Sequence, residues 1–208
     1  MSLRLLDLFC GAGGAARGYQ TAGFEVVGVD VAPQPRFPGE FWQEDALWAD
    51  LSGFDAFHAS PPCQRWSVAT NRPERWPDLI EPIRRRLLTT GRPFIIENVV
   101  GAPVRPDLLL CGSMFGLNVR RHRLFECERF MPLRLCCHHA ISPKPITVTG
   151  TGYGNYPRHR KGENLAEALT AMGMAGLPLT RRELTESLPP AYTAYIGPWL
   201  RAAIGENG

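Results

Sequence analysis

Short apolar runs, each ending in an acid or a turn, divide the first hundred residues of the chain. Residues 3–9 and 25–30 are two such runs, and a glycine turn and the helix-like stretch 15–22 lie between them. An apolar run bounded by turn residues is typical of a strand that is buried on both faces. The order strand, glycine turn, helix, strand therefore predicts the first half of a nucleotide-binding βαβ unit.

The same alternation continues along the chain. Residues 56–59 and 93–96 have the pattern of short strands, and residues 79–88 between them have helical spacing. Strands that alternate with helices predict an α/β fold, with a mostly parallel sheet flanked by helices.

The second half of the chain is less regular. Residues 131–162 are rich in Pro, Gly, His, Arg and Thr and show little periodicity, which predicts loops or a small irregular lobe. Thr180 and Glu183 have the spacing of a helix capping box, and Pro190 is suited to open a final helix over residues 191–203.

Four reactive or charged side chains come at the predicted strand ends: Asp7, Asp30, Cys63 and Glu97. The carboxyl ends of parallel strands meet at one edge of a sheet, where ligands bind in such folds. We therefore expect these four side chains to share one rim.

Charge and cysteine usage narrow the picture only slightly. The net charge of +3 is too small to indicate a polyanionic partner, but basic residues cluster at 84–86, 120–123 and 158–161. Such clusters suit phosphate contact, although residues 84–86 equally fit the charged face of a surface helix. The six cysteines form no disulfide framework, and no apolar run is long enough to cross a bilayer. We expect a reducing, cytoplasmic compartment and no membrane partner.

The stretch "SPPCQRWS" carries the first candidate chemistry. Two prolines stiffen the chain directly before Cys63. Arg65, Arg121 and Arg123 are available to favour a reactive thiolate, whereas an inert buried thiol is the plainer alternative. Glu97 is placed to donate a proton or hydrogen bond if burial keeps it protonated; a surface acid or a helix cap is its plainer alternative.

The glycine turn at residues 11–14 is the second candidate functional motif. Glycines beside a helix start let backbone N–H groups approach a ligand, and Asp30 suits a pair of ribose hydroxyls. The Lys-Ser/Thr of a P-loop is absent. An adenosine-bearing cofactor is indicated, with a plain tight turn as the alternative.

These motifs occur in an order that resembles the DNA cytosine-5 methyltransferases. "DLFCGAGG" (residues 7–14) resembles the cofactor loop of that family, "PPCQ" (61–64) its nucleophile motif and "ENV" (97–99) its acid motif. "RRHRLF" (120–125) is similar to its Arg-x-Arg element, and "SLPPAYTAYIG" (187–197) to the closing motif that packs against the cofactor loop.

The resemblance implies a Rossmann-like fold and a covalent reaction. Cys63 would attack C6 of a cytosine flipped out of DNA, while Glu97 engages N3 and the exocyclic amine. Arg123, with Arg121, would hold the base. C5 would then take a methyl group from S-adenosyl-L-methionine, leaving S-adenosyl-L-homocysteine.

The resemblance also implies binding residues. The cofactor is expected to contact Asp7, Phe9, Cys10, Gly11, Ala12, Gly13, Gly14, Asp30, Val31, Asp45, Ala46, Pro61 and Ser187. Gln64 and Ser67 would belong to a loop that closes over the base. The aromatic and basic loop 149–164 is the expected DNA-facing segment, alternatively a solvated loop. The full set of expected DNA contacts is Gln64, Arg65, Ser67, Tyr153, Arg158, Arg160 and Lys161.

The chain departs from the family pattern in its recognition region. We expect a catalytic and cofactor-binding domain over residues 1–130, a reduced target-recognition segment over 131–176, and C-terminal helices over 177–208 that pack back on the catalytic domain. So small a segment favours loose specificity or a partner protein that supplies it. Such compactness resembles phage or prophage enzymes of the restriction-modification type.

Two further departures concern the cofactor. Glu186 stands where many relatives have Asn before the closing motif, and Val31 replaces an aromatic residue that would stack on adenine.

The run Cys136, Cys137, His138, His139, with Cys127 nearby, raises the question of a metal. Zinc ligands usually come in separated pairs, and four consecutive residues cannot all reach one tetrahedral ion. We therefore expect no metal site.

Two alternatives to DNA cytosine methylation stay open. One is the same chemistry on a nucleotide or RNA, or with a modified donor. The other is a non-catalytic or partner-dependent DNA-binding homologue.

Overall fold

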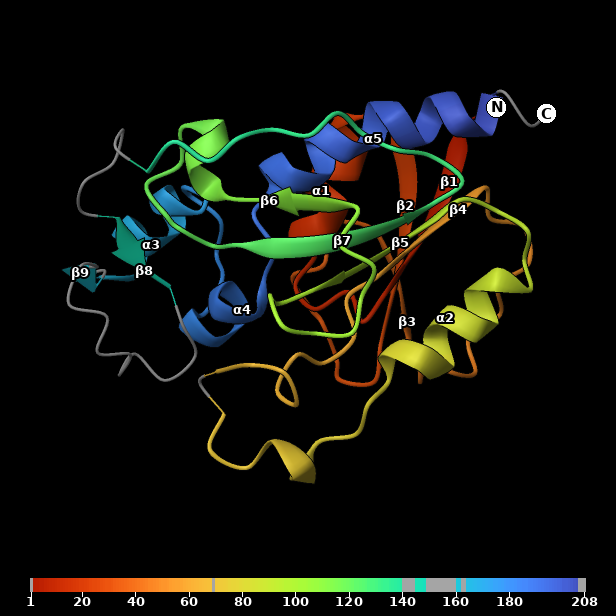
Figure 1. The fold of residues 1–208 in the computed structure, drawn as a ribbon, viewed down its shortest axis with the longest axis horizontal. Coiled ribbons are helices and arrows are strands. Elements are labelled where there is room, and N and C mark those ends of the chain that lie inside the picture. Colours follow the sequence, from red (N-terminus) through yellow and green to blue (C-terminus); the bar gives the residue numbers. More distant parts are fainter. Residues whose placement is uncertain (1, 69, 140–144, 149–159, 162–163, 206–208) are drawn as a thin grey trace.

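A seven-stranded sheet forms the centre of the molecule (Figure 1). The computed structural model describes residues 2–68, 70–139, 145–148, 160–161 and 164–205. The strand order is β3-β2-β1-β4-β5-β7-β6. The strands are β1 (Leu3–Leu8), β2 (Phe24–Asp30), β3 (Glu40–Gln43), β4 (Ala56–Ala59), β5 (Phe94–Asn98), β6 (Leu108–Leu110) and β7 (Arg123–Glu128).

Neighbouring strands from β3 to β5 are parallel, and only β7 runs antiparallel to its neighbours β5 and β6. The mostly parallel α/β sheet predicted from the sequence is thus confirmed. The chain leaves β1 toward β2 on one side and later enters β4 on the other. Ligands bind in such sheets at this switch point, beyond the carboxyl ends of the strands.

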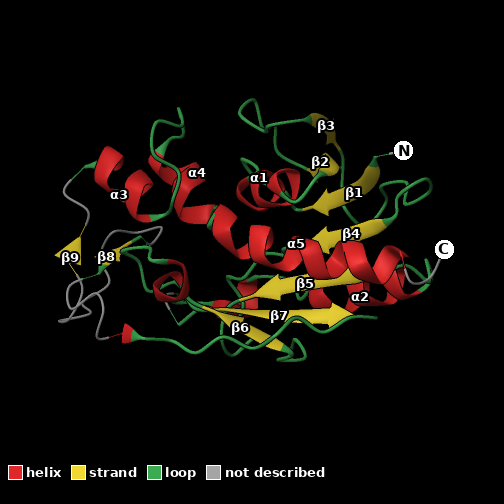
Figure 2. Cartoon of the chain, turned by 90° about the horizontal axis from the view of Figure 1, so that it is seen from above, coloured by secondary structure: helices red, strands yellow, loops and turns green. Residues whose placement is uncertain are grey.

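Helices cover both faces of the sheet (Figure 2). The helix α2 (Ile80–Leu88) packs on one face, in a core that includes Leu6 and Phe57. The other face carries α1 (Gly14–Thr21) and α5 (Pro190–Gly205), in a core that includes Leu5 and Ile95. Leu5 and Leu6 enter different cores because successive side chains of a strand point to opposite faces.

A third, smaller core lies beyond the carboxyl ends of the parallel strands. It joins α3 (Leu165–Ala171) and α4 (Arg181–Glu186) to β8 (Ile146–Thr147), a strand that pairs with β9 (Arg160–Lys161). Figure 2 shows these elements at the end of the molecule opposite the two labelled termini. The helix α3 was not anticipated, whereas the capping box that begins α4 is confirmed.

The closing motif (residues 187–197) packs so closely onto α1 that the two backbones are in contact. A Cβ added to Gly18 would lie 2.0 Å from Thr193 Oγ1 and 2.1 Å from the Pro190 carbonyl oxygen. A Cβ on Gly14 would lie 2.3 Å from the Leu188 carbonyl oxygen. Thr193 also donates a hydrogen bond of 2.8 Å to the carbonyl oxygen of Ala15. Glycine is required here because no side chain fits between the two backbones.

Two short 3-10 helices, η1 (Pro73–Arg75) and η2 (Gly112–Phe115), lie in the connections. No helix among the described residues is long and apolar enough to span a bilayer.

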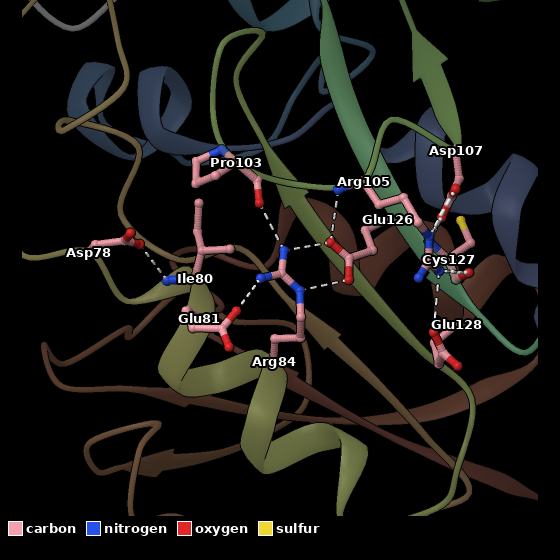
Figure 3. A network of polar contacts seen from close by, with 10 residues as sticks. All are labelled: Asp78, Ile80, Glu81, Arg84, Pro103, Arg105, Asp107, Glu126, Cys127 and Glu128. Carbon is pink, nitrogen blue, oxygen red and sulfur yellow. Dashed lines mark hydrogen bonds and ion pairs between the residues drawn. The ribbon is translucent and has the colours of Figure 1, made fainter.

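The basic cluster at residues 84–86 serves the fold. Arg84 forms two hydrogen bonds with Glu126 of β7, at 2.8 and 2.7 Å, and a third with Glu81 (Figure 3). Arg85 also pairs with Glu81, and Arg86 donates to the carbonyl oxygens of Ala46 and Ala49. Of the two alternatives, the charged helix face describes Arg85, whereas Arg84 and Arg86 are half-buried and bond to other parts of the fold.

Candidate active site

The turn after β1 holds a strained backbone. Phe9 has a φ of 60° and Gly11 a φ of 49°, both in the left-handed region. Such conformations are costly for a residue with a side chain and gather at functional sites. A Cβ built on Gly11 meets no atom within 4 Å, so the space over this glycine is open.

The side chain of Asp30 holds this turn against β2. Its Oδ2 accepts a hydrogen bond of 3.0 Å from the Gly11 amide, and its Oδ1 accepts one of 3.0 Å from the Ala32 amide. A carboxylate has about four acceptor positions, so it can still receive hydroxyl groups of a ligand.

Asp7 is buried without a partner below the turn. Its side chain is 1% exposed, and neither carboxylate oxygen accepts a hydrogen bond. Burial, followed by the negative charges of Asp30 and Glu97, raises the pKa of Asp7 well above its usual range. A buried polar group without a partner is unusual in a native fold and points to a group supplied from outside. These features fit a ligand with donor groups along Asp7, Gly11 and Asp30.

Other expected cofactor residues are differently placed. The side chains of Phe37 and Pro38 lie over Gly13, and the Ser187 hydroxyl donates a hydrogen bond of 2.6 Å to the Glu183 carbonyl oxygen. Asp45 is exposed, and its Oδ1 accepts from the Leu47 amide at 2.9 Å.

The remaining expected cofactor residues are either buried in the fold or exposed at the edge of the sheet. The interior of the fold takes Cys10, Ala12, Gly14, Ala46 and Pro61, and burial raises the pKa of the Cys10 thiol. Val31 is 73% exposed at the rim. Glu186 is in an exposed ion pair of 3.1 Å with Arg182.

The loop that carries Cys63 is tied to two neighbouring strand ends. The Ser60 amide donates to the Leu8 carbonyl oxygen at 3.1 Å, and Asn98 Nδ2 donates to the Pro61 carbonyl oxygen at 2.9 Å in a buried hydrogen bond. A turn follows, in which the Trp66 amide donates to the Cys63 carbonyl oxygen. Cys63 is half-buried and a free thiol.

Glu97 and Arg123 meet diagonally across the antiparallel pair β5 and β7. Glu97 is opposite Phe125 in the register, and Arg123 lies two residues before Phe125 in β7, on the same face. Their side chains form an ion pair of 2.9 Å between Glu97 Oε1 and Arg123 Nε. Glu97 is 7% exposed, so this pair is largely shielded from water.

The thiol of Cys63 lies within the electrostatic influence of this pair. Burial raises its pKa; Arg123 and Arg121 act to lower it and Glu97 acts to raise it. Burial prevails, so the net pKa lies above that of an ordinary thiol. The structure thus brings together the thiol, the acid and the guanidinium that the sequence analysis singled out.

Arg121 has a different environment from Arg123. Its guanidinium donates to the carbonyl oxygens of Val148, at 3.0 Å, and Thr185, at 2.7 Å. Its own carbonyl oxygen accepts a hydrogen bond of 2.6 Å from the Tyr192 hydroxyl. Burial and the charge of Arg123 lower the pKa of Arg121 to about 9. Arg121 joins the small third core to the rim of the sheet.

The expected DNA contacts are only partly described. Gln64, Arg65 and Ser67 are half-buried in the Cys63 loop. Arg65 donates to the Trp76 carbonyl oxygen at 3.0 Å, and Gln64 Oε1 is buried without a hydrogen-bond donor.

The remaining expected contacts lie in the small lobe. Arg160 and Lys161 make up the strand β9, which pairs with Ile146 and Thr147 of β8. Tyr153 and Arg158 lie outside the described residues.

A buried His58 was missed by the sequence analysis. Its Nδ1 is 2.9 Å from the Tyr19 hydroxyl and its Nε2 is 2.8 Å from Ser60 Oγ. Burial lowers its pKa to about 3, so the ring is neutral. His58 is next to Asp7 in the β1–β4 register and sets the position of Ser60 at the start of the Cys63 loop. A histidine inside a short apolar run was the only available signal.

No protein-family model and no curated protein matches this sequence. Solved structures do match. The chain is similar to a protein assigned as a DNA modification methyltransferase encoded within a prophage of E. coli, with 15% identity, a TM-score of 0.66, and coverage of 98% of this chain and 100% of that chain.

Two eukaryotic structures are comparably similar. A DNMT2 variant from Spodoptera frugiperda has 15% identity and a TM-score of 0.65, covering 96% of this chain and 100% of that chain. The Entamoeba histolytica methyltransferase EhMeth has 12% identity and a TM-score of 0.65, covering 97% of this chain and 98% of that chain. The chain therefore has the fold of these methyltransferases over nearly its whole length.

Proposed function

We propose that this protein is an S-adenosyl-L-methionine-dependent methyltransferase that methylates C5 of cytosine in DNA through a covalent adduct with Cys63. The observation that carries the proposal is the convergence of Cys63 with the Glu97–Arg123 ion pair at the carboxyl edge of the sheet. The three residues come from separate loops and strands, and the folded core does not require them to meet. A nucleophile, an acid and a cation around one point suit addition to a pyrimidine ring.

The rim beside this point fits the methyl donor. Asp30 has acceptor positions for the ribose hydroxyls, and the open side of Gly11 leaves room for the ligand backbone. Asp7 offers two buried carboxyl oxygens without a hydrogen-bond partner to polar groups of the cofactor. S-adenosyl-L-methionine, when bound, supplies the methyl group that C5 receives.

Cys63 performs the first step. Its sulfur bonds to C6 of the cytosine, which makes C5 nucleophilic in the manner of an enamine. After methyl transfer, a solvent molecule takes the C5 proton and the Sγ–C6 bond breaks with its electron pair on sulfur, which restores the aromatic ring and releases Cys63 as a thiolate. The proline pair and the Asn98 hydrogen bond hold the loop backbone, so that the sulfur is aimed rather than mobile.

Glu97 and Arg123 stabilise the electron shift during addition. Glu97 shares a proton with N3 of the base, where electron density accumulates when sulfur attacks C6, and accepts a hydrogen bond from the exocyclic amine. Arg123 orients the Glu97 carboxyl group through their ion pair and holds the base. Interactions of this kind contribute most where water is excluded, and Glu97 is buried.

The target base must leave the duplex to reach Cys63. Gln64 and Ser67 of the Cys63 loop would contact the flipped base, and Gln64 Oε1 has an acceptor position that a base amine can fill. Arg160 and Lys161 place basic residues on the small lobe, beyond the same strand ends. Specific target recognition is assigned to this lobe, with or without a partner protein.

The deciding experiment mixes the purified protein with methyl-labelled donor and, separately, duplex DNA, RNA and free cytidine nucleotides. Label in duplex DNA that disappears with Cys63→Ala supports the proposal. Label confined to RNA or nucleotide would instead establish the same chemistry on another substrate. DNA binding without transfer to any substrate would mark a non-catalytic homologue.

A second experiment tests the covalent step. DNA that carries 5-fluorocytosine should form an adduct resistant to denaturation, because fluorine cannot leave as the proton does. The adduct should be absent with Cys63→Ala. Methylation without any adduct would contradict a covalent route.

A further inference from the structure

Four metal-ligating side chains gather on the edge of the sheet behind the Arg121–Arg123 segment. They are Cys111, His122, Cys137 and His139, and their candidate ligand atoms all lie within 4.8 Å of one another. Cys111 Sγ is 3.6 Å from His139 Nε2, and Cys137 Sγ is 3.5 Å from His122 Nε2. In a tetrahedral zinc site with two sulfur and two nitrogen ligands, the sulfur-to-nitrogen separation is about 3.5 Å.

The fold explains why these four residues meet. The last residue pair of β6 and β7 is Leu110 opposite Arg123. One step beyond that pair, the antiparallel register places Cys111 opposite His122. The first two ligands are therefore neighbours across the end of a two-strand ladder.

The other two ligands come from the consecutive run after β7. Successive side chains of an extended chain point to opposite sides. Cys137 and His139 are half-buried and face the ladder, whereas Cys136 and His138 are exposed. The run thus contributes two ligands and not four. The other two come from the β6–β7 ladder, so the site is formed by two separated pairs, as is typical of zinc sites. Cys127, the other nearby cysteine, is buried in the main core.

The surroundings support a bound cation. Ser113 Oγ donates a hydrogen bond of 3.3 Å to Cys111 Sγ, and Arg120 donates one of 2.8 Å to the His139 carbonyl oxygen. Hydrogen bonds that orient ligand atoms from outside are characteristic of metal sites. Cys111 itself is fully buried, so its sulfur has little access to water.

We infer that Cys111, His122, Cys137 and His139 bind one structural zinc ion. The expectation of no metal, drawn from four consecutive residues, considered the wrong set of ligands. Four protein ligands leave no open position, so the ion is structural rather than catalytic. On binding, the ligands give up two thiol protons to solvent and close tetrahedrally on the metal. The ion would anchor the segment 133–139 to the start of β7 and fix His122, the residue between Arg121 and Arg123. The inference rests on these four residues alone and is independent of the proposed function.

Metal content and cobalt spectroscopy of the full chain test the inference. The protein purified under reducing conditions without chelator should contain about one zinc ion per chain. Replacing zinc with Co²⁺ should give the visible absorption of a tetrahedral ion together with a thiolate-to-metal band. Absence of zinc, combined with no such spectrum on Co²⁺ titration of the reduced protein, would overturn the inference. So would a disulfide between Cys111 and Cys137 in protein purified without reductant and chelator.

A matched pair of double variants locates the site. Cys137→Ser/His139→Ala should lose nearly all bound zinc, whereas Cys136→Ser/His138→Ala, which changes the same residue types in the same run, should keep it. Equal zinc content in the two variants would contradict the assignment. If the first variant does not fold, the cobalt spectrum of the unaltered protein still decides, because an octahedral or thiolate-free spectrum would reject a site with two sulfur ligands.

Discussion

The Glu97 carboxylate lies 2.9 Å from Arg123 Nε, across two antiparallel strands, and the charges of both residues act on the half-buried thiol of Cys63. The contact is an ion pair rather than a well-aligned hydrogen bond, since Glu97 Oε1 has no hydrogen-bond donor of good geometry. An oxygen held near a cation but still open to a donor is suited to receive the amine of a base. The pair therefore orients Glu97 without using up its acceptor capacity.

Glu97→Gln should lower kcat for methyl transfer by about 10²–10⁴, the range typical of a lost general acid. The amide has nearly the shape of the acid but cannot supply a proton or pair with Arg123. Single-turnover transfer to DNA measures the loss, and circular dichroism checks that the variant is folded.

Glu126→Gln is the matched control for that change. Glu126 is also a buried acid of the β5–β7 ladder, on β7, but it is bonded to Arg84 and to the Arg105 amide, outside the site (Figure 3). Its loss should cost about 2 kcal/mol of stability, the scale of a hydrogen bond to a charged group, and leave the rate of transfer nearly intact. Equal loss of activity in the two variants would remove the special role of Glu97.

The pH dependence of Cys63 alkylation should follow its raised pKa. Because burial outweighs Arg123 and Arg121, the thiolate fraction of the free protein should be small at neutral pH. The rate of modification by iodoacetamide should keep rising past the pKa of an ordinary thiol, about 8.5. Arg123→Met removes a charge that lowers this pKa, so the profile should move to still higher pH. Peptide mass spectrometry, with Cys63→Ala to identify the peptide, gives the rate. A rate that is already maximal at neutral pH would contradict the burial effect.

Asp7→Asn should stabilise the fold increasingly as pH rises. The folded-state pKa of Asp7 is raised, so above its unfolded-state pKa of about 4 the unfolded chain releases a proton that the folded chain retains. The wild type therefore loses stability with rising pH, until the pH passes the folded-state pKa. The advantage of the variant should grow by at most about 1.4 kcal/mol per pH unit. Urea unfolding at several pH values measures it.

Asp50→Asn provides a control of opposite sign. Hydrogen bonds from the Ser52 amide and hydroxyl lower the pKa of Asp50, so its contribution to stability is present above its unfolded-state pKa and is lost in acid.

The same Asp7→Asn variant should bind S-adenosyl-L-homocysteine more weakly by calorimetry. Unchanged affinity would exclude Asp7 from the cofactor site.

Gly18→Ala should separate α1 from the closing helix α5. The added Cβ would overlap Thr193 Oγ1 and the Pro190 carbonyl oxygen, and a backbone atom cannot rotate away. We expect a loss of about 3 kcal/mol, the upper part of the range for overpacked sites, measured by urea unfolding. Gly205→Ala, in α5 itself, meets no atom within 4 Å and should be neutral or slightly stabilising. Equal effects of the two changes would contradict the close packing.

Local patterns determined the first half of the sheet. Residues 56–59 were predicted as a strand and β4 spans Ala56–Ala59; residues 79–88 were predicted as a helix and α2 spans Ile80–Leu88. These assignments succeeded because burial on both faces, turn residues and helical spacing are each encoded within about ten consecutive residues. The strand ends that carry Asp7, Asp30, Cys63 and Glu97 followed from the same patterns.

Contacts that depend on strand register could not be predicted from the sequence. The diagonal meeting of Glu97 with Arg123 requires β7 to run antiparallel to β5 in one register, and a shift of one residue would turn Arg123 to the other face. The hydrogen bonds from Arg121 to the Val148 and Thr185 carbonyl oxygens likewise depend on a small core formed by distant segments.

The sequence by itself thus determined which chemical groups the chain carries and at which strand ends they lie. Only the tertiary structure decided which groups face one another: Glu97 with Arg123, and Cys111 and His122 with Cys137 and His139. The reason is physical. Side-chain direction along one segment follows from its local pattern, but the partner across a ladder is set by the packing that fixes register, and that packing is a property of the whole folded chain.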